Sequence, residues 1–191
     1  IDQIEHPAVR AVFQEHAILP WRSVAKNIGH GLELRGMAKD EREARVKDFI
    51  ELVGLTGFED KYPHELSGGM KQRCAVARTL CADPVVMLMD EPFAAVDAQT
   101  RITLQEELNR IAIATKKTII FITHAVDEAA FLGDRCFVFS ARPGRLKAIV
   151  DINIPREKRI WADLSADDEF ITKRDEILKL VREEVSVAVE E

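Results

Sequence analysis

The stretch "VVMLMDEP", residues 85–92, is an apolar run that ends in two acidic residues and a proline. Its apolar residues do not alternate with polar ones, which is typical of a parallel strand buried on both faces. Asp90 and Glu91 lie at the carboxyl end of this strand, and Pro92 stops it because proline has no N–H to donate to a sheet. Ligands of open α/β sheets bind at this edge. The stretch therefore predicts an α/β fold with a site beside its two carboxylates.

Two other apolar runs also end in a polar residue. "KTIIFITH", residues 117–124, ends in His124, and "AVRAVFQ", residues 8–14, ends in Gln14. A helical pattern over 98–114 lies between the runs 85–92 and 117–124. Strands that alternate with helices predict a parallel sheet, so we expect the polar ends of all three runs at one edge.

Residues 22–82 break this pattern, because they are helical and contain no convincing strand. The clearest helix is predicted over 40–54. Asp40 and Glu43 have the spacing of a capping box at its start, and Gly54 suits the position just after its end. We therefore predict a helical subdomain inserted into a sheet domain.

The C-terminal part of the chain predicts a hairpin and a long helix. Pro143-Gly144 suits a type II turn between two short strands. Residues 153–164 look irregular, and a last helix is predicted over 165–185. The predicted domains are a partial sheet domain, the helical subdomain and a C-terminal extension ending in a helix, at 1–21 with 83–152, 22–82 and 153–191.

The composition excludes several classes of protein. Hydrophobic residues make up 47% and charged residues 31% of the 191, which is typical of a globular domain. A net charge of −6 argues against nucleic acid as the main partner. No apolar run approaches the roughly 18 residues of a membrane span. The three cysteines form no C-x-x-C pair, so we expect reduced, packed thiols in the cytosol.

Paired glycines stand where a helix is expected to begin, in "LSGGM". Each glycine costs a helix about 1 kcal/mol relative to alanine. However, the N–H groups of a helix start attract anions, and glycines let a phosphate approach the backbone closely. Ser67 can cap the helix and also donate its hydroxyl. Ser67, Gly68 and Gly69 are therefore candidate phosphate-binding residues, and the alternative is a plain Ser-Gly-Gly turn.

The acidic pair has a defined chemistry in the same setting. Asp90 is a candidate Mg²⁺ ligand, since magnesium takes only one or two protein carboxylates besides phosphate oxygens. Glu91 can orient and polarise the water that attacks a phosphoryl group. The alternative is an Asp-Glu pair that opens a helix, where acidic residues favour the dipole. The apolar run before the pair favours the metal site.

Three single residues are weaker candidates. His124 can reach a terminal phosphate or the attacking water from its strand end, although a histidine there is often only hydrogen-bonded structure. Gln14 taken alone is an ordinary surface amide. Asp97 can simply cap the helix that follows it.

Together, "LSGGM", "VVMLMDEP", "FAAVD" and "ITH" resemble, in this order and spacing, the ATP-binding subunits of ABC transporters, over roughly residues 11–151. The resemblance implies a P-loop NTPase fold with a RecA-like core, N-terminally incomplete here, and an inserted helical subdomain. It implies ATP and Mg²⁺ as ligands and ATP hydrolysis as the activity. Ser67, Gly68 and Gly69 become the signature motif, which faces ATP held by a second copy in a head-to-tail dimer.

The resemblance also implies roles for the other candidates. Asp90 is the Walker B residue that holds Mg²⁺, and Glu91 is the catalytic base. Asp97 is the D-loop aspartate and His124 the switch histidine. Gln14 is the Q-loop residue, which touches Mg²⁺ and senses the transporter. Here "FAAVD" replaces the usual Gly-Ala-Leu-Asp wording of the D-loop.

One motif of the family is absent from these residues. None of the nine glycines is followed by lysine, so the chain holds no G-x-x-x-x-G-K-[ST] loop to cradle the phosphates. We expect the parent gene to encode this Walker A motif upstream of Ile1. We also expect residues 1–191 alone not to hydrolyse ATP, because the groups that fix the triphosphate are missing.

Longer matches such as "YPHELSGGMKQR" and "MDEPFAAVDAQTR" look most like importers of nitrate, sulfonates, taurine or bicarbonate. This implies a subunit on the inner, cytoplasmic face of the cell membrane. Its partners would be a second ATPase copy, transmembrane permease subunits and, indirectly, a solute-binding protein, with no nucleic acid. One alternative is a non-transport ABC-type ATPase, which the short segment 14–67 and the acidic charge disfavour. The other is a non-catalytic fragment without a P-loop.

Overall fold

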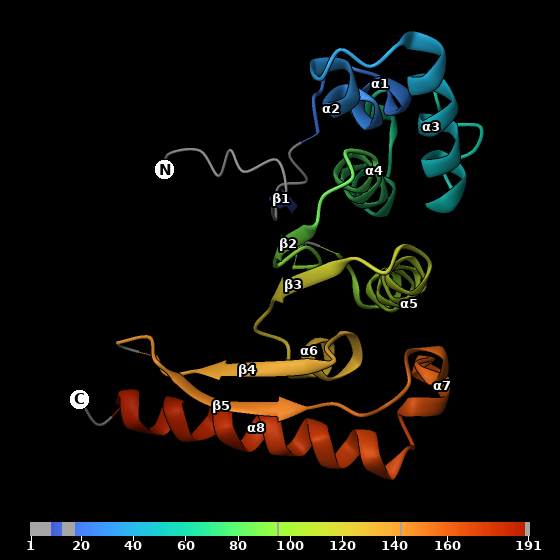
Figure 1. Cartoon of the computed structure of the whole chain (residues 1–191). Helices are drawn as coiled ribbons and strands as arrows, with labels where there is room; N and C mark the ends of the chain where they lie inside the picture. Colours follow the sequence, from blue (N-terminus) through green and yellow to red (C-terminus); the bar gives the residue numbers. More distant parts are fainter. Residues whose placement is uncertain (1–8, 13–17, 95, 142, 190–191) are drawn as a thin grey trace. The chain divides into compact units, whose positions relative to one another are not determined.

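The computed structural model describes residues 9–12, 18–94, 96–141 and 143–189, the last five of these by their backbone only. The chain divides into two compact units, residues 1–122 and residues 123–191 (Figure 1). Gln14 lies outside the described residues, as does the first residue of the predicted turn, Arg142.

A parallel sheet organises the first unit. Its described strands are β1 (Val9–Val12), β2 (Val86–Asp90) and β3 (Thr118–Ile122), in the order β1-β2-β3. The register places Asp90 beside Ile122 at the end of the central strand. This confirms the predicted α/β fold and its parallel strands.

The two faces of this sheet are covered differently. Met87 and Met89 are fully buried on one face, whereas Ile120 is 52% exposed and Ile122 is 45% exposed on the other. Successive side chains of a strand point to opposite faces, and α4 (Gly68–Cys81) and α5 (Ala98–Thr115) lie on the same side of the sheet (Figure 1). The second face of the sheet is therefore only partly covered, with Leu88 of β2 half-buried, which corrects the prediction of burial on both faces.

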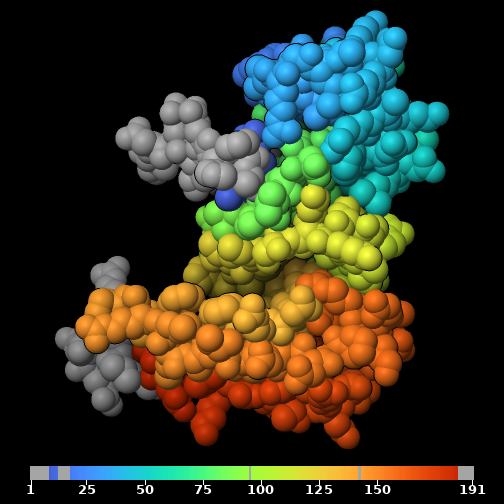
Figure 2. All heavy atoms as spheres, in the orientation of Figure 1, coloured from blue at the N-terminus to red at the C-terminus, as the bar shows by residue number. Residues whose placement is uncertain are grey.

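Residues 22–82 contain only helices and connections. The helices are α1 (Val24–Ile28), α2 (His30–Leu34), α3 (Lys39–Leu52), the short 3-10 helix η1 (Pro63–Glu65), and α4. Many of their apolar side chains are buried, and the atoms of α1 to α3 make a continuous body (Figure 2). The helical content agrees with the prediction, while the domain limits themselves stay a prediction.

The two ends of α3 (Lys39–Leu52) test the predicted capping box and the predicted terminal glycine. The predicted capping box is wrong: α3 begins at Lys39, its N-cap is Ala38, and no side chain caps it. Asp40 lies inside the first turn instead, where its charge favours the helix dipole. The C-terminal prediction is confirmed, because Gly54 has φ of +65° and its N–H donates to the Glu51 carbonyl at 3.1 Å.

The second unit contains the predicted hairpin and long helix. After α6 (Val126–Leu132), the strands β4 (Arg135–Phe139) and β5 (Leu146–Asp151) pair antiparallel, as predicted. The last helix, α8, runs from Asp168 to Val189. It begins three residues later than predicted and continues four residues further.

The segment 153–164 is only partly irregular, which corrects the prediction for its two short helical turns. It contains η2 (Arg156–Lys158) and α7 (Trp161–Leu164). The buried Arg159 guanidinium donates to the carbonyls of Ile154, Phe131 and Gly133 at 2.8–3.1 Å. Burial lowers the pKa of Arg159, although Asp134 offsets part of this by accepting a hydrogen bond at 3.1 Å. One arginine therefore fixes the path of the segment by donating to carbonyls of both the segment and the residues around the end of α6.

Candidate functional site

The acidic pair lies where the chain leaves the central strand. Asp90 is the last residue of β2 and its side chain is exposed. Glu91 follows with φ of +44°, and its N–H donates to the Ile122 carbonyl of β3 at 2.9 Å. A left-handed backbone costs a residue with a Cβ roughly 1–2 kcal/mol, and strain of this kind gathers at functional sites. The strand end thus turns sharply at the residue predicted to act as base.

Apolar packing holds the loop after Glu91. The Phe93 side chain is 2% exposed, and its ring lies 5.7 Å from the ring of Phe121 on β3. The Ala94 N–H donates to the Glu91 carbonyl at 3.2 Å. Because Phe93 is anchored in the core, the position of the Glu91 backbone is fixed on both sides.

Asp97 forms the N-cap of α5. Its carboxylate accepts a hydrogen bond from the Thr100 N–H at 3.0 Å. That bond, with a second from the Thr100 side chain, holds the pKa of Asp97 below its ordinary value. The capping alternative raised from the sequence is therefore realised, and the D-loop role stays a prediction.

The start of α4 has the arrangement that the glycines predict. Ser67 is the N-cap, and its hydroxyl oxygen accepts from the Met70 N–H at 3.3 Å. A Cβ added at Gly68 would meet nothing within 4 Å, whereas one at Gly69 would lie 3.1 Å from Thr100 Cγ2 on α5. Gly69 therefore lets the starts of α4 and α5 pack together, and packing within the described chain gives no reason for Gly68 to be glycine.

His124 belongs to the second unit and is described within it. Its side chain is exposed, in the short connection between Ile122, where β3 ends, and Val126, where α6 begins. On either side of it, the Thr123 hydroxyl donates to Glu128 at 2.6 Å and accepts from the Ala125 N–H at 3.0 Å. Neither Thr123 nor Glu128 was among the predicted site residues, although Thr123 belongs to the apolar run 117–124.

The carboxylates present suit a nucleotide-bound magnesium ion. Among the described side chains, no group of three or more histidines, cysteines and acidic residues gathers to hold a metal. Mg²⁺ needs no such cage, since it uses one or two carboxylates together with phosphate oxygens and water. The exposed carboxylate of Asp90, with that of Glu91 beside it in the chain, fits this requirement.

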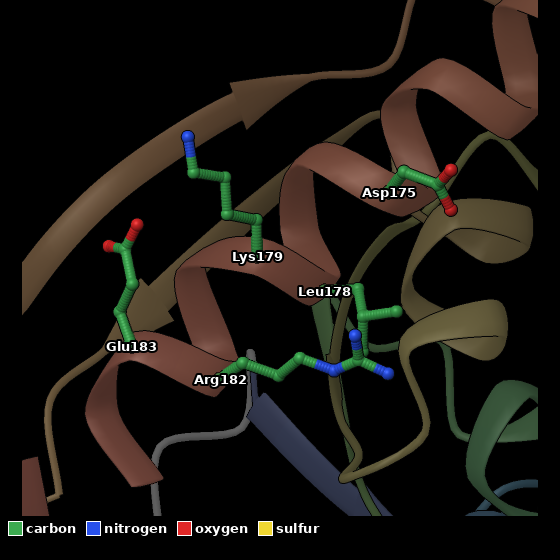
Figure 3. Close-up of a pocket in the computed structure, with 5 residues that line it drawn as sticks. All are labelled: Asp175, Leu178, Lys179, Arg182 and Glu183. Carbon is green, nitrogen blue, oxygen red and sulfur yellow. The ribbon is translucent and has the colours of Figure 1, made fainter. Parts of the chain in front are cut away.

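Two further features of the surface bear on the site. A hollow on α8, lined by Asp175, Leu178, Lys179, Arg182 and Glu183, is made by one helix and contains none of the predicted residues (Figure 3).

No helix in the described part of the chain is long and apolar enough to cross a membrane. The candidate site is therefore the sheet edge and the start of α4.

Proteins of one family resemble this chain along most of its length. Residues 2–94 match the family model described as ABC transporter. An uncharacterized ABC transporter ATP-binding protein of Methanocaldococcus jannaschii is 53% identical over 91% of this chain and 63% of its own length. The taurine import ATP-binding protein of Rhizobium johnstonii is 44% identical over 87% of this chain and 64% of its own length. The nitrate import ATP-binding protein of Synechocystis is 42% identical over 90% of this chain and 66% of its own length.

A solved structure agrees with this finding. It is the dimeric structure of a post-hydrolysis state of an ATP-binding cassette with ADP and phosphate bound. Its sequence is 26% identical, its TM-score is 0.62, and the match covers 77% of this chain and 64% of that one. The chain spans just under two thirds of the length of these relatives. With the motif resemblance confirmed, the chain belongs to the family of ABC transporter ATP-binding proteins.

Proposed function

We propose that the protein is the ATP-binding and ATP-hydrolysing subunit of an ABC importer. The observation that carries the proposal is the pair Asp90–Glu91 at the carboxyl edge of a parallel sheet, with Glu91 held in a left-handed turn. The ADP and phosphate in the similar solved structure support a nucleotide as the ligand.

Each candidate residue has a task in this proposal. Asp90 and Gln14 would hold Mg²⁺, and the bound ion would supply positive charge to neutralise the phosphates. Glu91 accepts a hydrogen bond from the attacking water and orients it, and His124 contacts the terminal phosphate. Phosphoryl transfer depends mainly on such positioning and on electrostatic stabilisation.

The signature residues act toward the nucleotide of a second copy. The first N–H groups of α4 are unpaired within the helix and attract anions. Ser67 and Gly68 are exposed, and Gly68 leaves open space beside the backbone. Ser67, Gly68 and Gly69 therefore face a phosphate across a head-to-tail dimer, and Asp97 lies beside them at the start of α5. The dimeric state of the similar solved structure supports this arrangement.

The transported solute is a small anion. The names of the relatives from Rhizobium and Synechocystis, for taurine and nitrate import, support this class, and sulfonates and bicarbonate belong to it as well. The subunit binds transmembrane permease subunits at the inner face of the membrane, and a separate solute-binding protein delivers the solute.

The test is Glu91→Gln in the complete gene product. The amide keeps the shape of the side chain but loses the charge that polarises water, so we expect kcat for ATP to fall about 10²–10⁴-fold. ATP binding should persist, and an ATP-bound dimer should accumulate in size-exclusion chromatography. Glu41→Gln, at an exposed position of α3, is the matched control and should hydrolyse ATP normally. Near-normal turnover by Glu91→Gln would remove Glu91 from the role of base.

A further inference from the structure

A buried carboxyl group lies beside the segment that carries His124. Glu128 belongs to the first turn of α6 and is only 6% exposed. It accepts a hydrogen bond from the Thr123 hydroxyl at 2.6 Å. A buried carboxyl is costly unless hydrogen bonds compensate it, so this bond ties Glu128 to the residue just before His124.

The same hydroxyl also holds the residue just after His124. Thr123 Oγ accepts a hydrogen bond from the Ala125 N–H at 3.0 Å. In an ordinary capping box, an acidic residue at the third helical position binds the N-cap N–H directly. Here Glu128 is that third residue and Ala125 is the N-cap, which has no capping side chain of its own. The Thr123 hydroxyl is inserted between them and relays the interaction.

The two hydrogen bonds of the Thr123 hydroxyl fix the residues on either side of His124 and do not bury the imidazole. Thr123 precedes it, Ala125 follows it, and the histidine itself is exposed. A hydroxyl that donates to one fixed group and accepts from another has both its hydrogen-bonding directions set. Through the Thr123 hydroxyl, the residues before and after His124 are therefore both linked to the buried Glu128 of α6.

We propose that Thr123 and Glu128 are positioning residues for His124. They hold the backbone of residues 123–125 so that the imidazole is presented to the nucleotide without reorganisation, as efficient positioning in catalysis requires. The proposal rests on the function proposed above, because it needs His124 to contact the reacting phosphate. Neither Thr123 nor Glu128 is required to touch the nucleotide.

The experiment measures ATPase kinetics of the complete gene product with single and double substitutions. His124→Ala is the reference and should lower kcat about 10²-fold or more. Thr123→Val keeps the shape and loses the hydroxyl, and should lower kcat about tenfold, with the KM for ATP changed less than about twofold. Thr123→Ser keeps the hydroxyl and should restore kcat to within about threefold of the wild type.

The double variant separates positioning from general stability. When His124 is already alanine, Thr123→Val should cause less than about a twofold further loss, because both changes act through one side chain. Hydrogen exchange provides a readout apart from activity: the Ala125 amide should exchange at least about tenfold faster in Thr123→Val than in Thr123→Ser.

Each outcome decides one of the two proposals. Normal kcat in His124→Ala would overturn the role of His124 in the proposed function. A strong loss in His124→Ala with normal kcat in Thr123→Val would overturn the positioning role alone, and so would fully additive losses in the double variant. If Thr123→Val does not fold, Glu128→Gln takes its place. Its amide oxygen still accepts the hydroxyl but more weakly, so kcat should fall about threefold, and an unchanged kcat would overturn the positioning role.

Discussion

The turn after β2 and the start of α4 depart from local preference in opposite directions. At Glu91 the backbone is left-handed, where glycine is the favoured residue, yet the chain has a glutamate. At Gly68 the backbone is helical and a methyl group would fit, yet the chain has a glycine. In both places local stability is sacrificed. The proposed function accounts for both positions, because a nucleotide would require the carboxylate of Glu91 and the open space beside Gly68.

The largest effect is expected from Glu91→Gly in the complete gene product. We expect kcat to fall about 10²–10⁴-fold. The free energy of unfolding should rise by up to about 1 kcal/mol, because glycine adopts the left-handed turn without strain. ATPase assays and urea denaturation measure the two effects.

Lys116→Gly is the matched control for that substitution. Lys116 ends α5 with φ of +52° and lies outside the candidate site. The same relief of strain should stabilise this variant while leaving kcat unchanged. A lower free energy of unfolding in Glu91→Gly than in the wild type would show that the turn is not strained, and would contradict this explanation.

A smaller effect is expected from alanine at the start of α4. Gly68→Ala should raise the free energy of unfolding by about 0.5 kcal/mol, since the methyl group meets open space and alanine favours helix. Its ATPase activity should nevertheless fall, because the methyl group would occupy space needed by the phosphate. Denaturation and ATPase assays on one preparation test both statements, and a fully active Gly68→Ala would contradict the ligand explanation.

Alanine at the neighbouring Gly69 should have the opposite effect on stability. Gly69→Ala should be less stable than Gly68→Ala, because its Cβ would lie 3.1 Å from Thr100 Cγ2. Adding Thr100→Ser removes that methyl group and keeps the hydroxyl near Asp97. The double variant should therefore recover most of the difference in the midpoint of urea denaturation. If the midpoint does not recover, the loss of stability in Gly69→Ala has a cause other than the contact with Thr100.

The smallest effect concerns pH. The hydrogen bond from Thr100 lowers the pKa of Asp97 in the folded state, so the unfolded state binds the proton more tightly. The stabilisation is therefore present above the ordinary pKa of 3.8 and is lost as pH falls through the lower folded value. Asp97→Asn has no such titration. The stability difference between wild type and Asp97→Asn should shrink between pH 6 and pH 2 in urea denaturation, and a constant difference would contradict the assignment.

Much of the fold was predictable because its signals are local. The acidic pair at the end of β2, the hairpin of β4 and β5 and the glycine just after α3 all follow from residue type and spacing. The site residues at Ser67 to Gly69, Asp90 and Asp97 have the local structure that their motifs predict. Their contacts with a nucleotide stay predictions, as do those of His124 and Gln14.

The features that were missed depend on distant parts of the chain. The path of segment 153–164 depends on Arg159, whose carbonyl partners include Phe131 and Gly133, more than 20 residues away in sequence. The exposure of Ile120 and Ile122 was missed because an apolar run shows what can be buried and says nothing about what covers it. The left-handed turn at Glu91 has no sequence signal, since glutamate rarely adopts that conformation.

The aromatic stack of the second unit offers an optical probe. Trp161 stacks on Phe131 with ring centroids 4.5 Å apart and meets the edge of Phe170 at 5.8 Å. The sequence has one other tryptophan, Trp21, which belongs to the first unit and is 71% exposed. Each unit thus carries a single indole fluorophore in a contrasting environment. With Trp21→Phe and Trp161→Phe variants, the emission of the remaining tryptophan reports on one unit at a time, so their melting can be followed separately in the intact chain.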